Sequence, residues 1–192
     1  MIYVILLLIL VFVYCTKFDK RGKPILYKNM HIEKLKHLDF DYFVEKVGDN
    51  RISVHRGKFN MVSTTMKEFY QQMVAGNDRD YLKSEDEYNL LSMLGIKGEI
   101  INEFGKLFDK NVKNIISRDL GFWMGGKGTT TGWHTDIEDL NYLYLVRGKK
   151  RIMLISPMYN ECMYEENITA FGARYSSIDF KNVDYDKYPK FK

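Results

Sequence analysis

The tripeptide His134-Thr135-Asp136 is the feature that most restricts what this chain can be. On a strand, residues i and i+2 point to the same side, so an imidazole nitrogen and a carboxylate oxygen can reach one ion. This donor pair suits Fe(II), Mn(II) or Zn(II), and it supplies two corners of a 2-His-1-carboxylate iron site. Alone it is a weak signal, because a surface histidine beside an aspartate in a turn has the same letters.

The residues around the tripeptide are typical of a β-hairpin with a metal pair at one end. A G-x-x-G turn at Gly125–Gly128 and three threonines come before it. After it, Leu140–Val146 predicts a buried strand, Arg147–Lys150 a tight turn, and Arg151–Ile155 a second apolar strand. This context favours the metal-site interpretation.

The stretch from Gly125 to Pro157 resembles the first half of the metal-binding core of JmjC-type, cupin-like Fe(II)- and 2-oxoglutarate-dependent oxygenases. That group includes asparaginyl and lysyl protein hydroxylases and histone demethylases. The resemblance implies that His134 and Asp136 are iron ligands and catalytic residues. It also implies 2-oxoglutarate as cosubstrate, with its keto-acid end on the iron.

The resemblance assigns further residues to the cosubstrate. Thr131 is expected to hydrogen-bond the distal carboxylate of 2-oxoglutarate, and Lys150 to pair with the same carboxylate, with Lys149 as the alternative. A dicarboxylate needs a cation and a hydroxyl donor at its far end. Asn141 is expected near the cosubstrate. Trp123 either walls the pocket or is an ordinary core residue.

Ile2–Cys15 is an unbroken apolar run. A spanning helix needs about 20 residues and rarely fewer than 17, a limit that the run approaches with its two neighbours. It lacks the charged start and the small-residue cleavage site of a signal peptide. We expect an uncleaved transmembrane anchor over residues 1–16, with a buried core strand as the alternative. Four basic residues within residues 17–23 predict that the domain lies on the cytosolic side.

Composition suits one globular domain of 192 residues. The net charge is only +4, and much of the excess follows the apolar run or lies in the C-terminal tail, so we expect no direct nucleic-acid binding. Contact with anionic lipid explains the basic residues at least as well. The two cysteines, Cys15 and Cys162, do not form a disulfide framework, which predicts a reducing compartment.

Between the apolar run and the tripeptide, the pattern predicts several helices and short strands. The expected helices are Phe40–Val47, Lys67–Ala75, Tyr88–Leu94 and Ile100–Phe108, and the expected strands are Arg51–Arg56, Tyr81–Lys83 and Arg118–Met124. Residues 158–169 read as a polar loop. The lone histidines His31, His37 and His55 are expected to be solvated rather than ligands.

The family's third iron ligand is a later histidine, and no histidine follows His134. We therefore expect residues 24–192 to form a JmjC/cupin-like domain that lacks its C-terminal strands. Glu138 and Asp139 could supply an oxygen ligand, but a turn is expected there and solvated side chains with it. The expected fold class is α+β: N-terminal helices packed on a partial double-stranded β-helix (jelly-roll, cupin-like), preceded by the transmembrane helix.

Three functions from different classes are compatible with these residues. The first is a dioxygenase that hydroxylates a protein side chain. The second is a catalytically inactive, membrane-anchored interaction domain, favoured by the missing histidine. The third is a plain sugar- or metal-binding cupin, which has no need for the dicarboxylate clamp of Thr131 and Lys150.

Overall fold

The structure is a computed structural model, and it describes residues 6–12, 24, 26, 28, 32–57, 60–84, 90–107, 120–136, 141–168 and 174–192. The chain divides into two compact units. Unit 1 comprises Met1–Thr129 and Glu138–Lys150, and unit 2 comprises Thr130–Ile137 and Arg151–Lys192. Each unit is described by itself below.

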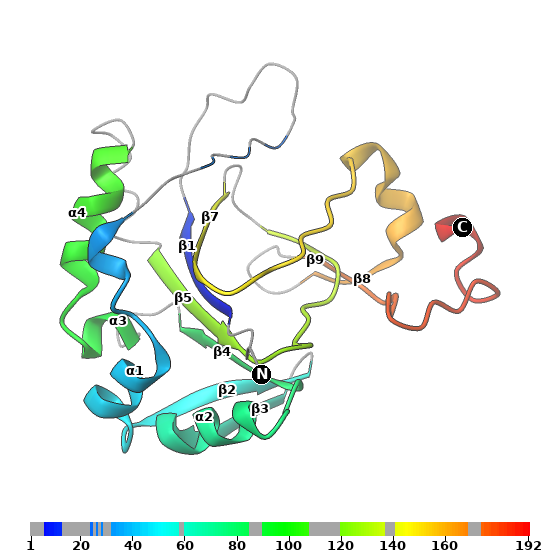
Figure 1. The fold of residues 1–192 in the computed structure, drawn as a ribbon. Coiled ribbons are helices and arrows are strands. Elements are labelled where there is room, and N and C mark those ends of the chain that lie inside the picture. Colours follow the sequence, from blue (N-terminus) through cyan, green and yellow to red (C-terminus); the bar gives the residue numbers. More distant parts are fainter. Residues whose placement is uncertain are drawn as a thin grey trace. The chain divides into compact units, whose positions relative to one another are not determined.

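Unit 1 contains a six-stranded sheet in the order β3-β2-β4-β5-β1-β7, in which all neighbours are antiparallel (Figure 1). The strands are β1 (Leu6–Phe12), β2 (Arg51–Arg56), β3 (Asn60–Thr65), β4 (Asp80–Ser84), β5 (Leu120–Gly125) and β7 (Asn141–Arg147). The helices are α1 (Phe40–Val47), α2 (Met66–Val74), α3 (Leu90–Met93) and α4 (Lys97–Leu107), with a short 3-10 helix, η1, at Glu33–Leu35. The helices and strands predicted between the apolar run and the tripeptide are confirmed, with ends that differ by no more than three residues; residues 88–89, Phe108 and residues 118–119 lie outside the described residues.

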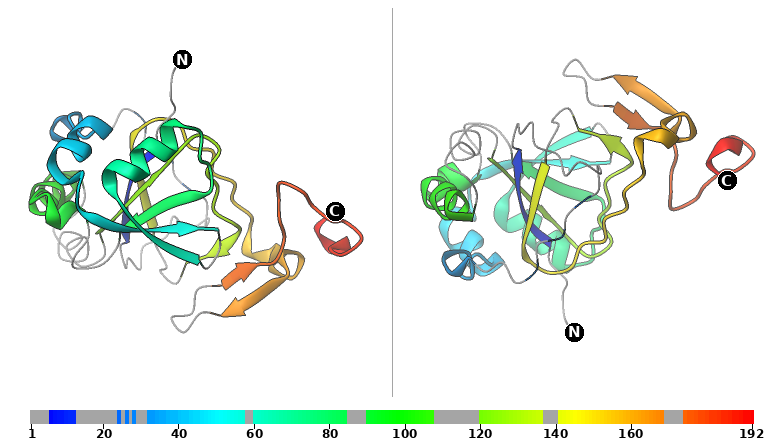
Figure 2. Two further views of the ribbon diagram at one scale, coloured as in Figure 1. Left: turned by 90° about the horizontal axis from the view of Figure 1, so that it is seen from below. Right: turned by 90° about the horizontal axis from the view of Figure 1, so that it is seen from above.

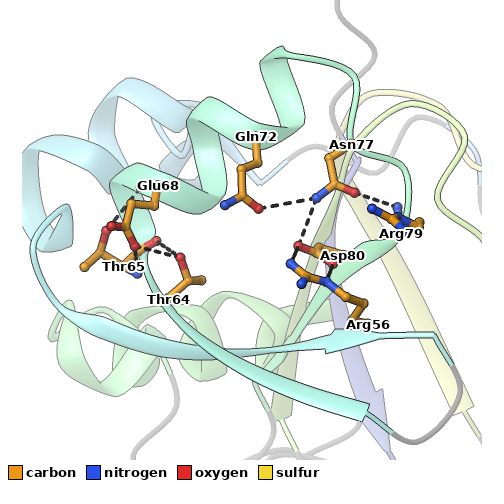
Figure 3. A network of polar contacts seen from close by, with 8 residues as sticks. All are labelled: Arg56, Thr64, Thr65, Glu68, Gln72, Asn77, Arg79 and Asp80. Atoms are coloured by element: carbon orange, nitrogen blue, oxygen red, sulfur yellow. Dashed lines mark hydrogen bonds and ion pairs between the residues drawn. The ribbon is translucent and has the colours of Figure 1, made fainter.

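Local sequence signals explain where α1 and α2 begin. The Asp39 side chain accepts a hydrogen bond from the backbone N–H of Tyr42 at 2.9 Å and caps α1. Thr65 and Glu68 form a reciprocal capping box at the start of α2, with bonds of 3.1 and 3.0 Å (Figure 3). These bonds satisfy backbone donors that have no partner inside the helix.

One apolar core joins the helices to the sheet. Each of α1 and α2 buries residues at i, i+3 and i+7, which lie on one helix face. Phe43 of α1 packs against Phe122 of β5, with ring centroids 5.2 Å apart, and Phe104 of α4 packs against Tyr144 of β7 at 5.2 Å. The helices therefore cover the face of the sheet to which Phe122 and Tyr144 point.

The described part of the apolar N-terminal run is a strand and not a membrane helix. Leu6–Phe12 forms β1, which lies between β5 and β7 (Figure 2). Leu8 is the backbone partner of both Trp123 and Leu145. No helix within the described ranges is long and apolar enough to cross a membrane. The predicted anchor over residues 1–16 and the membrane localisation with a cytosolic domain are therefore wrong; the rest of the run lies outside the described residues. A strand with another strand on each side can also have a continuous apolar sequence. Composition therefore did not distinguish a membrane helix from a core strand.

The predicted hairpin after the tripeptide is also wrong. Its first strand forms as β7, but β7 pairs with β1 and has one exposed face, with Leu143 and Leu145 39% and 37% exposed. Arg151–Ile155 belongs to unit 2 and lies in neither sheet. An apolar segment becomes a strand only where another strand accepts and donates its backbone hydrogen bonds, and no described strand does so here.

Unit 2 contains a three-stranded antiparallel sheet in the order β6-β9-β8. Its strands are β6 (His134–Thr135), β8 (Glu165–Ile168) and β9 (Arg174–Ser176), and its 3-10 helices are η2 (Pro157–Met163) and η3 (Pro189–Phe191). The expectation of a polar loop over residues 158–169 is wrong, because η2 and β8 occupy most of it. Pro157 at the first position and the Ser156 side chain, which accepts from the N–H of Met158, start η2.

Candidate metal centre

Strand β6 carries His134 and Thr135, and Asp136 follows it directly. The Nε2 atom of His134 lies 3.6 Å from the Oδ1 atom of Asp136. The two side chains are 33% and 39% exposed, so solvent or a ligand can reach them. The pair is therefore neither buried in a core nor splayed to opposite sides.

A backbone carbonyl selects the tautomer of His134. Its Nδ1 atom lies 2.8 Å from the carbonyl oxygen of Gly132. Because a carbonyl can only accept, Nδ1 carries the proton and Nε2 of a neutral ring keeps its lone pair. Metal-bound histidines characteristically donate their second nitrogen in this way. Gly132 was not identified from the sequence, because every residue carries a backbone carbonyl and only the local conformation of the chain brings this one to Nδ1.

An aromatic ring covers one side of His134. The imidazole and the phenol ring of Tyr175 are nearly parallel, with an interplanar angle of 21° and centroids 5.5 Å apart. The two residues are direct partners across the β6–β9 ladder. Nothing near Tyr175 in the sequence indicated this contact, because strand pairing between distant segments produces it.

The donor set fits a divalent transition metal. Bond lengths to such an ion are about 2.1 Å, so two ligands in octahedral or tetrahedral positions lie about 3.0–3.4 Å apart. The 3.6 Å between His134 and Asp136 is slightly longer, and a small rotation of the exposed carboxylate closes the difference. These two residues alone leave the remaining positions of the ion to other ligands.

Among the described residues no group of three or more His, Cys, Asp or Glu side chains is placed to hold a metal. His37 is exposed and packs edge-on against Tyr42 at 4.9 Å, which fits a solvated histidine. Burial, and next the charge of Lys83, lower the pKa of His55, so this ring is neutral near pH 7. His31, Glu138 and Asp139 lie outside the described residues.

The predicted cosubstrate residues fall in both units. Thr131 is exposed and belongs to unit 2, as His134 and Asp136 do, whereas Trp123, Asn141 and Lys150 belong to unit 1. Their roles toward 2-oxoglutarate stay predictions. Trp123 is 3% exposed on β5, and its neighbour Phe122 points to the helices, so Trp123 points to the opposite side of the sheet. Trp123 is therefore buried, but it does not belong to the core cluster that lies between the helices and the sheet.

In unit 1, the glycine-rich turn that leads toward the tripeptide packs against the loop before β4. A side-chain carbon on Gly126 would lie 2.9 Å from the backbone oxygen of Asn77, which is closer than such atoms come in proteins. Gly128 has a φ of +93° and approaches Asp78. Both positions therefore require glycine, one for space and one for its backbone conformation.

An ion-pair network holds that loop. Arg56 donates two hydrogen bonds of 2.7 Å to the carboxylate of Asp80, whose side chain is 1% exposed (Figure 3). The amide of Asn77 donates to the same carboxylate at 2.9 Å, and its oxygen accepts from the N–H of Arg79. Chiefly because Arg56 donates to it, the carboxyl of Asp80 has a pKa below its usual value.

Comparison with known proteins decides the family. The family described as "Cupin-like domain" matches residues 16–192. The chain is a member of the JmjC/cupin-like family. Several curated proteins are similar to it. JmjC domain-containing protein D of Dictyostelium discoideum is 34% identical over 84 residues, which is 44% of this chain and 18% of that protein.

Two further relatives of this cupin-like chain match over a larger share of it. The tRNA wybutosine-synthesizing protein 5 of Gallus gallus is 23% identical over 89% of the chain and 58% of its own length. HSPB1-associated protein 1 of Homo sapiens is 26% identical over 69% of the chain and 29% of its own length. The chain thus spans less than two thirds of each of these relatives. No solved structure matches.

Proposed function

We propose that this cupin-like chain carries part of the centre of an Fe(II)- and 2-oxoglutarate-dependent oxygenase that hydroxylates a protein side chain. His134 and Asp136 would be the two metal ligands that it supplies. The observation that carries the proposal is the 3.6 Å approach of His134 Nε2 to Asp136 Oδ1, together with the tautomer selected by Gly132. Membership of a family that includes oxygenases supports it.

Bound iron would supply the redox chemistry that couples oxidation of 2-oxoglutarate by O2 to hydroxylation of the substrate. The protein's contribution is to hold the metal ligands in the right orientation and to bind 2-oxoglutarate. Gly132 keeps the proton of His134 on Nδ1, away from the ligand atom. Thr131 and Lys150 would bind the far carboxylate of 2-oxoglutarate, because a hydroxyl donor and an ammonium group complement its charge.

A protein substrate is proposed because the net charge of +4 is mild for a chain that binds nucleic-acid backbones. The names of two relatives point to different substrate classes, since one contains tRNA and the other a protein, HSPB1. The open position of His134 and Asp136 is compatible with a macromolecular substrate of either class. Hydroxylation of protein is the proposal, and modification of RNA is the outcome that would replace it.

A second function has one observation in its favour. Within the described part of the chain, no third His, Cys, Asp or Glu side chain is placed to hold a metal together with His134 and Asp136. Loss of one protein ligand weakens iron binding and leaves a more exposed ion. The alternative is therefore a catalytically inactive relative that acts as an interaction domain.

The test is metal binding and turnover by the full chain. We expect Co(II), used as a visible substitute for Fe(II), to bind to the wild type, and His134→Ala and Asp136→Ala each to weaken it by about 100-fold. The exposed His37→Ala is the matched control and should bind as the wild type does. Succinate formed from 2-oxoglutarate with Fe(II) and O2 reports turnover, and Lys150→Ala should raise the KM for 2-oxoglutarate.

The outcomes separate the two functions. Metal binding that depends on His134 and Asp136, with succinate formation, supports the oxygenase. The same binding without succinate, at saturating iron and 2-oxoglutarate, favours the inactive interaction domain. Metal binding that is unchanged in both variants would remove the basis of the proposed centre.

A further inference from the structure

We propose that Tyr175 is a positioning residue for the metal ligand His134. The proposal rests on the proposed function, because it gives Tyr175 a role at the same centre. Its basis is the near-parallel stack between the phenol and imidazole rings, with centroids 5.5 Å apart. Tyr175 acts through His134 and is not itself assigned as a ligand.

Two contacts together restrict the two side-chain torsions of His134. The hydrogen bond to the Gly132 carbonyl fixes one edge of the imidazole ring, the edge that carries Nδ1. This bond alone still allows the ring to swing about that edge. The stacked ring of Tyr175 blocks the swing on one side, so Nε2 stays near the Oδ1 atom of Asp136.

Tyr175 is itself well anchored, which a positioning residue requires. It pairs with His134 across the ladder to β6 and with Asn167 across the ladder to β8. The next residue, Ser176, is buried; its N–H donates to the Trp133 carbonyl and its hydroxyl donates to the Met163 carbonyl. These bonds fix the segment of β9 from which the ring of Tyr175 extends.

The other side of β6 is packed separately. Trp133 points away from His134 and makes edge contacts with Phe180 and Phe191, with centroids 5.8 and 6.3 Å apart. These contacts stabilise the strand but do not touch the imidazole. Tyr175 is therefore the aromatic residue, among those described, that orients the ligand ring itself.

The experiment compares Tyr175→Leu with Tyr175→Phe in the full chain. The first keeps apolar bulk and removes the flat ring, whereas the second keeps the ring and removes only the hydroxyl. Tyr159→Leu is the matched control, because Tyr159 is in the same unit and is 54% exposed. The probe is Co(II) alone, measured by its visible spectrum and by calorimetry.

We expect Tyr175→Leu to weaken Co(II) binding by about tenfold, the lower end of the effect of residues that orient metal ligands. Tyr175→Phe and Tyr159→Leu should stay within about twofold of the wild type. A second readout needs no metal: the ring protons of His134 should resonate upfield in the wild type and in Tyr175→Phe. In Tyr175→Leu they should move to the positions of an unstacked histidine. Trp133 fluorescence, in a Trp123→Phe background, verifies that each variant is folded.

Wild-type affinity in Tyr175→Leu, in an experiment where His134→Ala loses binding, would overturn the role of Tyr175 and leave the proposed centre intact. Equal losses in Tyr175→Leu and Tyr175→Phe would also overturn it, because the flat ring would then not be the cause. If His134→Ala binds Co(II) like the wild type, both the proposed centre and this inference fail.

Discussion

Units 1 and 2 are stabilised by different means. Unit 1 has a continuous apolar core, in which side chains such as Phe43, Phe69 and Phe122 are completely buried between helices and sheet. Unit 2 buries few apolar side chains and depends on aromatic pairs and on hydroxyl-to-carbonyl bonds such as Tyr188 to Ser177. The candidate metal ligands belong to unit 2. Local stability differs across proteins, and functional sites are often drawn from its lower end.

The exposed apolar residues emphasise the contrast. In unit 2, the consecutive residues Ile152–Ile155 are 38–67% exposed, and Met158 is 78% exposed. In unit 1, the strand β5 is buried along its whole length. We therefore expect unit 1 to unfold at a higher urea concentration than unit 2. The chain has two tryptophans, Trp123 in unit 1 and Trp133 in unit 2, and each can report on its own unit.

The largest effect is expected from Phe122→Ala, which removes a completely buried ring that packs on Phe43. It should lower the free energy of unfolding of unit 1 by about 3–5 kcal/mol. In a Trp133→Phe background, urea unfolding followed by Trp123 fluorescence measures this loss. In a Trp123→Phe background, the Trp133 transition should hardly move. Equal shifts of both transitions would show that the units unfold together.

The next effect concerns the ion pair of unit 1. Asp80→Ala leaves Arg56, which is 37% exposed, without its carboxylate and should cost about 2–3 kcal/mol, less than for a fully buried pair. Because Arg56 lowers the pKa of Asp80, the pair stabilises the fold above the unfolded Asp pKa of about 3.9. That contribution is lost as the pH falls through the lower, folded pKa.

The pH profile of unfolding checks the ion pair in a second way. As the pH falls below about 5, the free energy of unfolding of the wild type should decrease more steeply than that of Asp80→Asn. The exposed Asp49→Asn is the control and should keep the wild-type slope. Identical slopes in all three proteins would mean that the Arg56–Asp80 pair contributes little to folding.

A glycine pair compares the two units directly. Gly126→Ala in unit 1 places a methyl group 2.9 Å from the Asn77 carbonyl oxygen and should cost about 1–2 kcal/mol through the backbone shift that it forces. Gly132→Ala in unit 2 meets nothing within 4 Å and should change stability by less than about 0.5 kcal/mol. Thermal unfolding of both variants measures the two losses of stability. Equal losses would contradict the close packing of the glycine-rich turn.

The smallest loss of stability that we expect in unit 1 comes from removing the cap of α2. Thr65→Ala removes the acceptor for the N–H of Glu68 and should cost about 1 kcal/mol in unit 1. Thr65→Ser restores a hydroxyl and should recover most of the loss. Urea unfolding followed by Trp123 is the measurement. No recovery in the serine variant would show that the threonine methyl group, and not the cap, stabilises this end of the helix.

Much of unit 1 and the core of the site could be predicted from local sequence. Asp39 and Thr65 mark the starts of α1 and α2, since a cap acts within three residues of itself. The pair His134 and Asp136 was predicted for a similar reason, because strand alternation brings residues i and i+2 to one side. In each case the physical cause lies within a few residues.

Where the cause lies far along the chain, prediction from sequence was wrong or silent. Leu6–Phe12 was assigned to a membrane helix, because an apolar run is compatible with a helix or a flanked strand until its neighbours are known. Arg151–Ile155 was expected to form a strand and has no strand beside it in the described structure. The contact of Tyr175 with His134 had no local signal at all.

The sequence by itself therefore determined the family, the starts of α1 and α2 to within one residue, and the approach of His134 to Asp136, because motifs, capping and the alternation of side chains are short-range properties. Only the tertiary structure decided that Leu6–Phe12 is a strand between β5 and β7, and that Tyr175 lies against His134. Strand pairing joins segments that are distant in the chain. Because nearly every residue offers the same backbone donor and acceptor, the local sequence does not tell which strands will pair.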